Sequence, residues 1–218
     1  MTGSGRGVLF PERLPSFQRL PAPAAVRDLV RWFWIPEWDL PPGTTSRQEV
    51  VAYPASNLVV EEDLVGLAGP TTRRTHRDLV GTGWAVGALL RPAAVAALVE
   101  DPASVRDAYR RLDLPDLHAV VSEAMQAADR GSRHEEAVKA FSAWLRTRVP
   151  DLTDEARLAN SLSDLIEGDR KVLHPADAAA RLGVSTRTVQ RLAKRYVGLP
   201  PSAMIRRRRL QEAAERIR

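Results

Sequence analysis

Hydrophobic residues follow two different periods along this chain. Between residues 32 and 90, apolar runs of four to seven residues alternate with turn signals such as Pro41-Pro42-Gly43 and Gly81-Thr82-Gly83. This pattern predicts strands over residues 32–38, 49–53, 57–61, 64–67, 73–79 and 84–90, with a short helix over 24–31 before them. The first twenty-odd residues, rich in Gly, Pro and Arg, are expected to be extended. The N-terminal part is therefore predicted to be a small antiparallel sheet or partial barrel.

From Pro92 onward, apolar positions recur every three or four residues, which is the period of an α-helix. We predict helices over residues 92–100, 102–112, 117–128, 134–148 and 153–166, with Asp101 as a cap of the second. A polar, glycine-broken stretch at 167–171 is the expected domain hinge. One apolar stripe suits either a core or a dimer interface, and it consists of Ala137, Phe141, Leu145 and Val149, with Trp144 beside it.

Residues 175–196 predict two short helices joined by a tight turn. Pro175 suits the first position of a helix, where its missing N–H costs nothing. Gly183 is the expected left-handed residue that ends this helix. Ser185 or Thr186 can cap the second helix. The inward-facing positions of the second helix are Val189, Leu192 and Tyr196.

The opposite stripe of the second helix is basic and polar. Its positions follow the spacing i, i+3, i+4, i+7 and are Arg187, Gln190, Arg191 and Lys194. A helix that enters the DNA major groove needs such a stripe, because Arg pairs with guanine and Gln with adenine. We assign base contacts to Arg187, Gln190 and Arg191. The backbone contacts are assigned to Ser185, Thr186, Lys194 and Arg195. A basic helix face is also often a merely solvated surface, and that alternative stays open.

Residues 174–218 resemble the first helix-turn-helix and the linker helix of transcription regulators of the AraC/XylS type. The resemblance rests on Ala178-Ala-Ala-Arg-Leu-Gly-Val-Ser185, on Val189-Gln-Arg-Leu192 and on Gly198-Leu-Pro-Pro201, followed by the helical run 202–218. In that run, residues 206–209 are four arginines that spread around the helix. The positions expected to pack inward are Ile205, Leu210, Ala213 and Ile217. The family's second helix-turn-helix is not in this sequence, so the single module should bind DNA weakly unless the chain dimerises.

The N-terminal part is similar to the cupin-like sensor domains of such regulators. The similar stretches are Val51-Ala-Tyr-Pro-Ala-Ser-Asn-Leu-Val-Val60 and Gly83-Trp-Ala-Val-Gly-Ala-Leu-Leu-Arg-Pro-Ala-Ala94. The resemblance implies a domain that senses an effector, pairs protomers, or both. It also implies double-stranded DNA, a small-molecule effector, RNA polymerase and a second copy of the chain as partners.

The charge is distributed unevenly. The net formal charge is +5, but residues 170–218 hold 13 Lys/Arg against 3 Asp/Glu, and the remainder holds 19 against 24. A basic end on an acidic body suits contact with DNA through that end. The absence of cysteine excludes disulfides, zinc–thiolate sites and cysteine nucleophiles. Without a signal-peptide pattern or an apolar run of membrane length, we expect a cytoplasmic protein that does not contact membranes.

The aromatic residues of the N-terminal part suit either a core or a ligand pocket. The pocket candidates are Trp32, Trp34, Tyr53 and Trp84, with Trp38 in the same aromatic set. The four histidines show no metal-ligand spacing, and no nucleophile elbow or phosphate-binding glycine loop occurs. We therefore predict no catalytic residues, no metal and no cofactor.

These observations lead to one prediction of fold and function. We expect an α+β protein with a sensor-like domain over residues 1–100, a helical connecting or dimerisation region over 101–168, and a helix-turn-helix with its linker helix over 169–218. The predicted function is sequence-specific DNA binding by a regulator. The alternative is a small-molecule-binding β-domain whose basic helical tail docks a protein partner.

Overall fold

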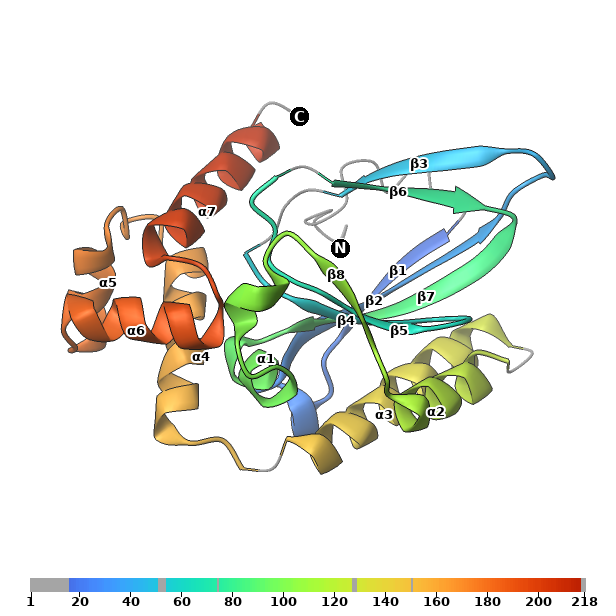
Figure 1. Ribbon diagram of the computed structural model, residues 1–218, viewed down its shortest axis with the longest axis horizontal. Helices are drawn as coiled ribbons and strands as arrows, with labels where there is room; N and C mark the ends of the chain where they lie inside the picture. Colours follow the sequence, from blue (N-terminus) through green and yellow to red (C-terminus); the bar gives the residue numbers. More distant parts are fainter. Residues whose placement is uncertain (1–15, 51–53, 74, 127–128, 150, 217–218) are drawn as a thin grey trace.

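The computed structural model describes residues 16–50, 54–73, 75–126, 129–149 and 151–216. These residues form an α+β fold, as predicted, in which an antiparallel sheet region is followed by helices (Figure 1). The strands are β1 (Ser16–Pro21), β2 (Val30–Asp39), β3 (Thr45–Val50), β4 (Asn57–Glu61), β5 (Val65–Ala68), β6 (Thr75–Val80), β7 (Thr82–Leu90) and β8 (Tyr109–Leu112). The helices are η2 (Ala24–Val26), α1 (Pro92–Leu98), η3 (Pro102–Val105), α2 (Pro115–Met125), α3 (Arg130–Arg148), α4 (Asp154–Gly168), α5 (Pro175–Leu182), α6 (Thr186–Tyr196) and α7 (Pro201–Arg216), of which η2 and η3 are single 3₁₀ turns.

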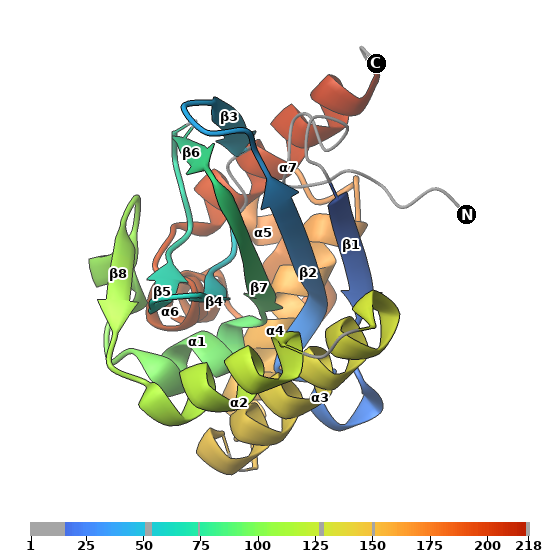
Figure 2. The same cartoon turned by 90° about the vertical axis from the view of Figure 1, so that its right-hand side faces the viewer.

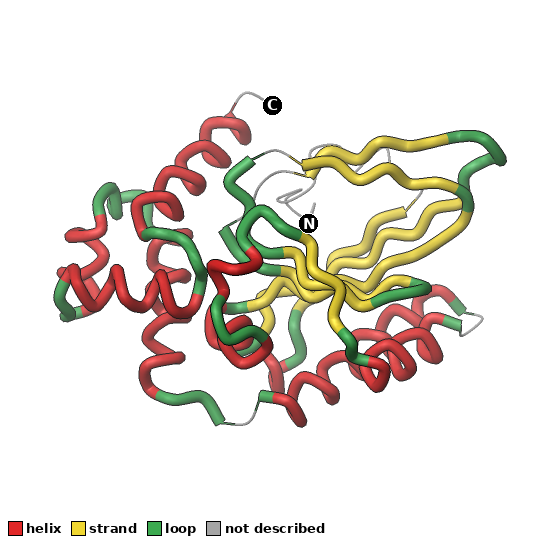
Figure 3. Tube along the Cα trace, viewed as in Figure 1, coloured by secondary structure: helices red, strands yellow, loops and turns green. Residues whose placement is uncertain are grey.

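The strands are arranged in two layers. Six of them form one sheet in the order β1-β2-β7-β4-β5-β8, and β3 pairs with β6 in a separate two-stranded ribbon. The ribbon lies over one face of the large sheet, and helices α2 and α3 cover the other face (Figures 1 and 2). Figure 3 shows the strands gathered on one side of the molecule and the C-terminal helices on the other. Among the described strands the arrangement is an open sandwich.

Strand β2 shows why the alternating pattern predicts the sheet. Phe33 and Ile35 are fully buried on the face covered by α3, where the rings of Phe33 and Phe141 meet edge to face with centroids 5.5 Å apart. Trp32 and Trp34 occupy the opposite face. The apolar stripe of α3 packs against the sheet and is not left exposed for a dimer. All of its residues are buried in this core: Ala137, Phe141, Trp144, Leu145 and Val149.

A polar cluster lies within this core, between β1, β2 and α3. The carboxylate of Glu37 forms an ion pair with Arg133 and lies within hydrogen-bond distance of His134, whose Nε2 is 3.1 Å from Glu37 Oε1. The other ring nitrogen of His134 contacts the side-chain oxygen of Gln18. Both Glu37 and His134 are buried. The cluster therefore ties α3 to the two strands by interactions that exclude water.

Three local predictions were wrong in part. The helix expected over 102–112 is the short η3, followed by strand β8, because Arg106 has an extended backbone that ends the turn and Asp107 after it is left-handed with φ 56°. Asp101 still caps η3, since its side chain accepts the N–H of Ala103 at 3.0 Å. The helix expected over 24–31 is limited to η2, because β2 begins at Val30, which already pairs with Leu90 of β7. Residues 16–21, which the sequence predicts only to be extended, form the edge strand β1. Of the strand predicted over 49–53, residues 51–53 lie outside the described residues.

Helices α4 to α7 pack around a second hydrophobic cluster. Its buried members come from α4 (Ala159, Leu162, Ile166), α5, α6 and α7, with Ala93 of α1 at its edge. Helix α4 thus packs with the helices that follow it. The stretch at 167–171, predicted to be the domain hinge, connects α4 to α5, and its role as a hinge stays a prediction.

Arg208 fixes the end of α4 in place. This side chain is 5% exposed, and its guanidinium donates to three backbone carbonyls: Ile166 at 3.1 Å, Val172 at 2.9 Å, and Asp169. The carbonyls near a helix C-terminus lack partners within the helix, so a buried cation is a suitable donor there. Arg208 therefore serves the protein interior, in contrast to its neighbours Arg206 and Arg209, which are exposed.

The inward face of α7 differs from the predicted one. Met204 and Ile205 are buried together with Arg208, which is the spacing i, i+1, i+4 of one helix face. Leu210, predicted to pack inward, is 57% exposed, and Ala213 is exposed too. The reason is that Arg208 occupies the inward position in that turn, so Leu210 lies two positions away on the outer side. Ile217 lies outside the described residues.

Helix α4 also contacts the sheet region. Asn160 is buried and bridges two backbones, accepting the N–H of Ala93 at 3.0 Å and donating to the carbonyl of Asp28 at 2.8 Å. Arg31 at the start of β2 pairs with Asp164 at 2.9 Å and with Glu167 at 2.7 Å. These contacts connect the C-terminal helices to the sheet through α4 itself.

Candidate functional site

The turn between α5 and α6 has the predicted geometry. Pro175 is the first residue of α5, and Gly183 ends that helix with φ 66° in the left-handed region. The carboxylate of Asp177 accepts the backbone N–H groups of Leu173 at 2.9 Å and His174 at 2.7 Å. These two bonds, that from His174 first, hold the pKa of Asp177 below its usual value. The start and the end of α5 are therefore both fixed by local interactions.

Helix α6 begins at Thr186, and Ser185, one of the two predicted cap residues, is its N-cap. The hydroxyl of Ser185 accepts the N–H of Thr188 at 3.1 Å, which is an N-cap bond. The inward residues are buried against α4 and α5: Val189, Leu192, Ala193 and Tyr196. All seven residues predicted to contact DNA are exposed on this helix or at its cap: Ser185, Thr186, Arg187, Gln190, Arg191, Lys194 and Arg195. Their exposure agrees with the predicted stripe, and their contact with DNA stays a prediction.

An acidic side chain borders this stripe. Glu155, in the first turn of α4, accepts hydrogen bonds at the same carboxylate oxygen from Arg191 at 2.8 Å and from Arg195 at 3.0 Å. The hydrogen bond from Arg191 is the largest cause that lowers the pKa of Glu155. Sequence reasoning missed this residue, because nothing in the pattern of α4 indicates which side of α6 its first turn faces. Two of the candidate DNA-contacting arginines thus share one carboxylate partner.

A cavity of about 470 Å³ lies between the large sheet and the β3–β6 ribbon. Its floor is formed by alternate residues of β2, namely Trp32, Trp34 and Trp38. Two glycines of β7 make room for these rings: a methyl group on Gly87 would lie 2.0 Å from Trp34 Cε2, and one on Gly83 would lie 2.5 Å from Trp38 Cζ2. The absence of a side chain at these two positions therefore lets the indoles lie against the sheet.

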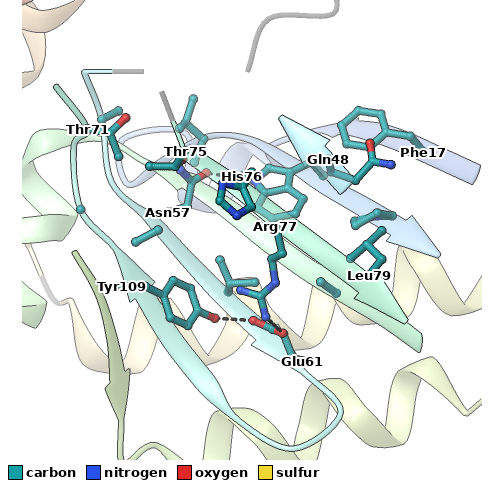
Figure 4. A pocket seen from close by; sticks show the side chains of 18 of the residues that line it. Phe17, Gln48, Asn57, Glu61, Thr71, Thr75, His76, Arg77, Leu79 and Tyr109 are labelled. Atoms are coloured by element: carbon teal, nitrogen blue, oxygen red, sulfur yellow. Dashed lines mark hydrogen bonds and ion pairs between the residues drawn. The ribbon is translucent and has the colours of Figure 1, made fainter. Parts of the chain in front are cut away.

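One cluster of polar groups lies at one end of the cavity, while Gln48, Asn57, Thr71, Thr75 and His76 lie elsewhere in its lining (Figure 4). Figure 4 shows Tyr109 and Arg77 directed toward Glu61 from two different strands, β8 and β6. The carboxylate of Glu61 accepts hydrogen bonds from the Tyr109 hydroxyl and the Arg77 guanidinium, one on each oxygen. Burial, and after it the hydrogen bond to Glu61, raise the pKa of Tyr109 far above its usual value, so its hydroxyl stays protonated.

The predicted pocket residues divide between the two faces of the sheet. Trp32 and Trp34 line the cavity, and so does Trp38 of the same aromatic set. Trp84 does not line it and packs against the hydrophobic core on the opposite face, because it precedes Ala85 of the cavity wall by one residue in β7. Tyr53 lies outside the described residues. The alternation of β2 alone would have grouped Trp38 with Trp32 and Trp34.

Sequence reasoning also missed one wall of the cavity and its connection to the C-terminal helices. Asp107, Ala108 and Tyr109 line the cavity directly after η3. On its other side η3 contacts the turn after α6, where a methyl group on Gly198 would lie 2.6 Å from the backbone of Pro102 and Ala103. The chain from 102 to 109 thus contacts the end of α6 and then lines the cavity.

The described residues contain no group of three or more His, Asp or Glu side chains placed to hold a metal ion. No helix among them is long and apolar enough to span a bilayer.

Comparisons with known proteins found one matching family model and similar solved structures. A family model described as "Domain of unknown function (DUF6597)" matches residues 18–107, which is less than half of the chain. No curated protein matches the sequence. One similar solved structure is the apo form of a ToxT variant from Vibrio cholerae, with 12% identity and a TM-score of 0.43, covering 85% of this chain and 82% of that chain. Another is the AraC-like transcriptional activator CuxR, with 12% identity and a TM-score of 0.28, covering 93% of this chain and 88% of that chain. The function must therefore be argued from the residues of this chain.

Proposed function

We propose that this chain is a DNA-binding transcription regulator that places α6 in the major groove. The observation that carries the proposal is the α5–turn–α6 unit, in which Gly183 and Ser185 fix the turn while a basic stripe of α6 stays exposed. Arg187, Gln190 and Arg191 read base edges. The residues at the helix start and the outer flank hold the helix on the phosphate backbone: Ser185, Thr186, Lys194 and Arg195.

The large-sheet cavity is the second part of the proposal. A small molecule binds between the tryptophans of β2 and the β3–β6 ribbon and acts as an effector. Its walls include Asp107 and Tyr109, which follow η3, and η3 contacts the turn after α6. Supporting this role, the cavity volume of about 470 Å³ lies within the usual range of ligand sites, about 300–1,000 Å³.

The test of DNA binding is fluorescence anisotropy of the full chain on a random-sequence duplex across a salt series. We expect log K to fall steeply and linearly with log[salt], because phosphate contacts release counterions. The double variant Arg187→Ala/Arg191→Ala should bind at least tenfold more weakly than the unchanged chain. Its matched control is Arg146→Ala/Arg148→Ala, which removes the same charge from exposed positions of α3.

The control makes the outcome specific to α6. If both double variants lose the same affinity, the binding depends on overall charge and α6 has no special role. If binding is absent or insensitive to salt, the proposal fails, and the alternative of a basic tail that docks a protein partner gains. A single helix-turn-helix buries little DNA surface, so binding should be weak at physiological salt unless two copies bind together.

A further inference from the structure

We propose that the cavity over the β2 tryptophans selects an uncharged, planar aromatic ligand. The inference rests on the proposed effector pocket and is independent of the proposed DNA contacts. Three features carry it: the rings that form the floor, the hydrogen bonds of those rings, and the partners of the charged groups in the walls.

The floor of the cavity is made of aromatic faces. Three atoms of the Trp34 ring lie 2.0, 2.2 and 2.6 Å from the position where Gly87 would carry a methyl group. Such similar distances mean that the ring lies flat over the glycine, so its other face is turned away from the sheet. Tyr109 lies over Gly66 in the same way, with three ring atoms at 2.2, 2.3 and 2.5 Å. Two flat rings on the same face of the large sheet suit a planar partner that stacks on them.

The indole N–H groups of two floor residues already have acceptors. Trp34 Nε1 donates to Asn57 Oδ1 at 2.9 Å, and Trp38 Nε1 donates to the carbonyl of Val80 at 3.1 Å. These rings therefore offer a ligand their π faces and few polar groups. An apolar aromatic surface gains most from such a floor, because its burial removes area from water without breaking hydrogen bonds.

The charged groups in the walls are already engaged. Among the described lining residues, the two carboxylates are Glu61, bonded to Arg77 and Tyr109, and Asp107, bonded to the backbone and side chain of Thr72. The two guanidinium groups are Arg77 and Arg19, and the latter lies over the Trp32 ring at 4.6 Å from its centroid. The guanidinium and carboxylate groups of the walls are equal in number, so neither an anion nor a cation meets an excess of these charges; His76 also lines the cavity.

A charged ligand would have to compete with one of these resident partners. It would give up its own hydration and also leave a wall group with a weakened contact, and both effects reduce affinity in a partly buried site. A neutral ligand avoids both losses. Its polar substituent can still accept from a remaining N–H of Arg77 or donate to the oxygen of Tyr109, at the end where Figure 4 places them together.

The experiment compares three molecules that share one ring system: indole-3-acetamide, which is neutral, indole-3-acetate and tryptamine. Isothermal titration of the full chain measures the affinity of each at pH 7. We expect saturable binding of indole-3-acetamide and at least tenfold weaker binding of the other two. Tighter or equal binding of the acetate or of tryptamine would overturn the selection for a neutral ligand, and no saturable binding of the amide would overturn the proposal altogether.

Two variants test the location. Trp34→Leu removes a floor ring and should weaken the amide at least tenfold, whereas Trp84→Leu, on the opposite face of the same sheet, should leave the affinity within twofold. Far-UV circular dichroism verifies that both variants are folded. If Trp34→Leu binds like the unchanged chain, the floor is not the site. No DNA is present in these titrations, so their failure leaves the DNA proposal standing, and the failure of DNA binding leaves this one standing.

Discussion

Replacing Arg208 by methionine should destabilise the C-terminal helices strongly. The guanidinium donates to the carbonyls of Ile166, Asp169 and Val172 from a side chain that is 5% exposed. Methionine keeps an unbranched apolar stem of similar reach but donates nothing. The carbonyls of Ile166 and Val172 would then lie in the interior without the donor they have now.

The magnitude follows from the number of bonds. Three hydrogen bonds from a charged donor contribute about 1.5 kcal/mol each at the low end of their range. Methionine avoids part of the desolvation cost of a buried guanidinium, which offsets some of that loss. The net destabilisation should be about 2–4 kcal/mol. With a urea m-value of about 2 kcal/mol per molar, the unfolding midpoint should fall by about 1–2 M.

The assay is urea unfolding followed by circular dichroism at a helix-sensitive wavelength. The matched control is Arg209→Met, the adjacent and exposed arginine of the same run, for which we expect a change within about 0.5 kcal/mol. DNA affinity should show the opposite ranking of the two variants when both are folded. Arg209→Met should weaken DNA binding more than Arg208→Met, because exposed arginines of α7 can reach phosphates and Arg208 cannot. If Arg208→Met and Arg209→Met unfold at the same urea concentration, the reasoning about the buried arginine is wrong.

Three other changes test separate parts of the structure. Glu155→Gln should strengthen duplex binding and steepen the salt slope by about one, because Arg195, the proposed phosphate contact, loses its carboxylate partner. Salt-series anisotropy measures this, and weaker binding would contradict it. Glu37→Ala should cost about 3–5 kcal/mol in urea unfolding because His134 and Arg133 lose a buried acceptor, and a loss under 1 kcal/mol would refute that role. The lowered pKa of Asp177 means that its stabilising contribution is present above about pH 4 and is lost as the pH falls through the lowered pKa. Asp177→Asn should therefore flatten the acidic part of the curve of unfolding free energy against pH. An unchanged curve would exclude the effect.

Local sequence signals predicted the α5–turn–α6 unit well. Gly183 is needed for a left-handed backbone, Ser185 for an N-cap, and Val189 and Leu192 for a helix with one buried face. Each signal acts within a few residues, so neighbouring sequence is sufficient to reveal it. The strand β4 was predicted over its observed range for the same reason, since its apolar run is bounded by turn residues.

Features that depend on contacts between distant residues could not be predicted. Trp84 and Trp34 are both aromatic strand residues, but only the register of β7 against β2 decides which face each one occupies. Strand β8 exists because Tyr109 pairs with Ala68 of β5, 41 positions earlier. The inward position of Arg208 similarly depends on three carbonyls 36 to 42 residues away. A pattern of polar and apolar residues contains no information on such pairings.

The double attachment of α4 has a consequence for how two copies would sit on an operator. Asn160 and Asp164 join this helix to the sheet region, while its buried residues form the core beneath α6. A flexible tether would let two recognition helices adjust to varied half-site separations. Here α6, the helix proposed to enter the groove, packs on α4, which also contacts the sheet. The rotation between two half-sites around the DNA axis would therefore be set by the protein. Paired sites should then tolerate changes of a full turn of duplex, about 10 base pairs, far better than changes of half a turn.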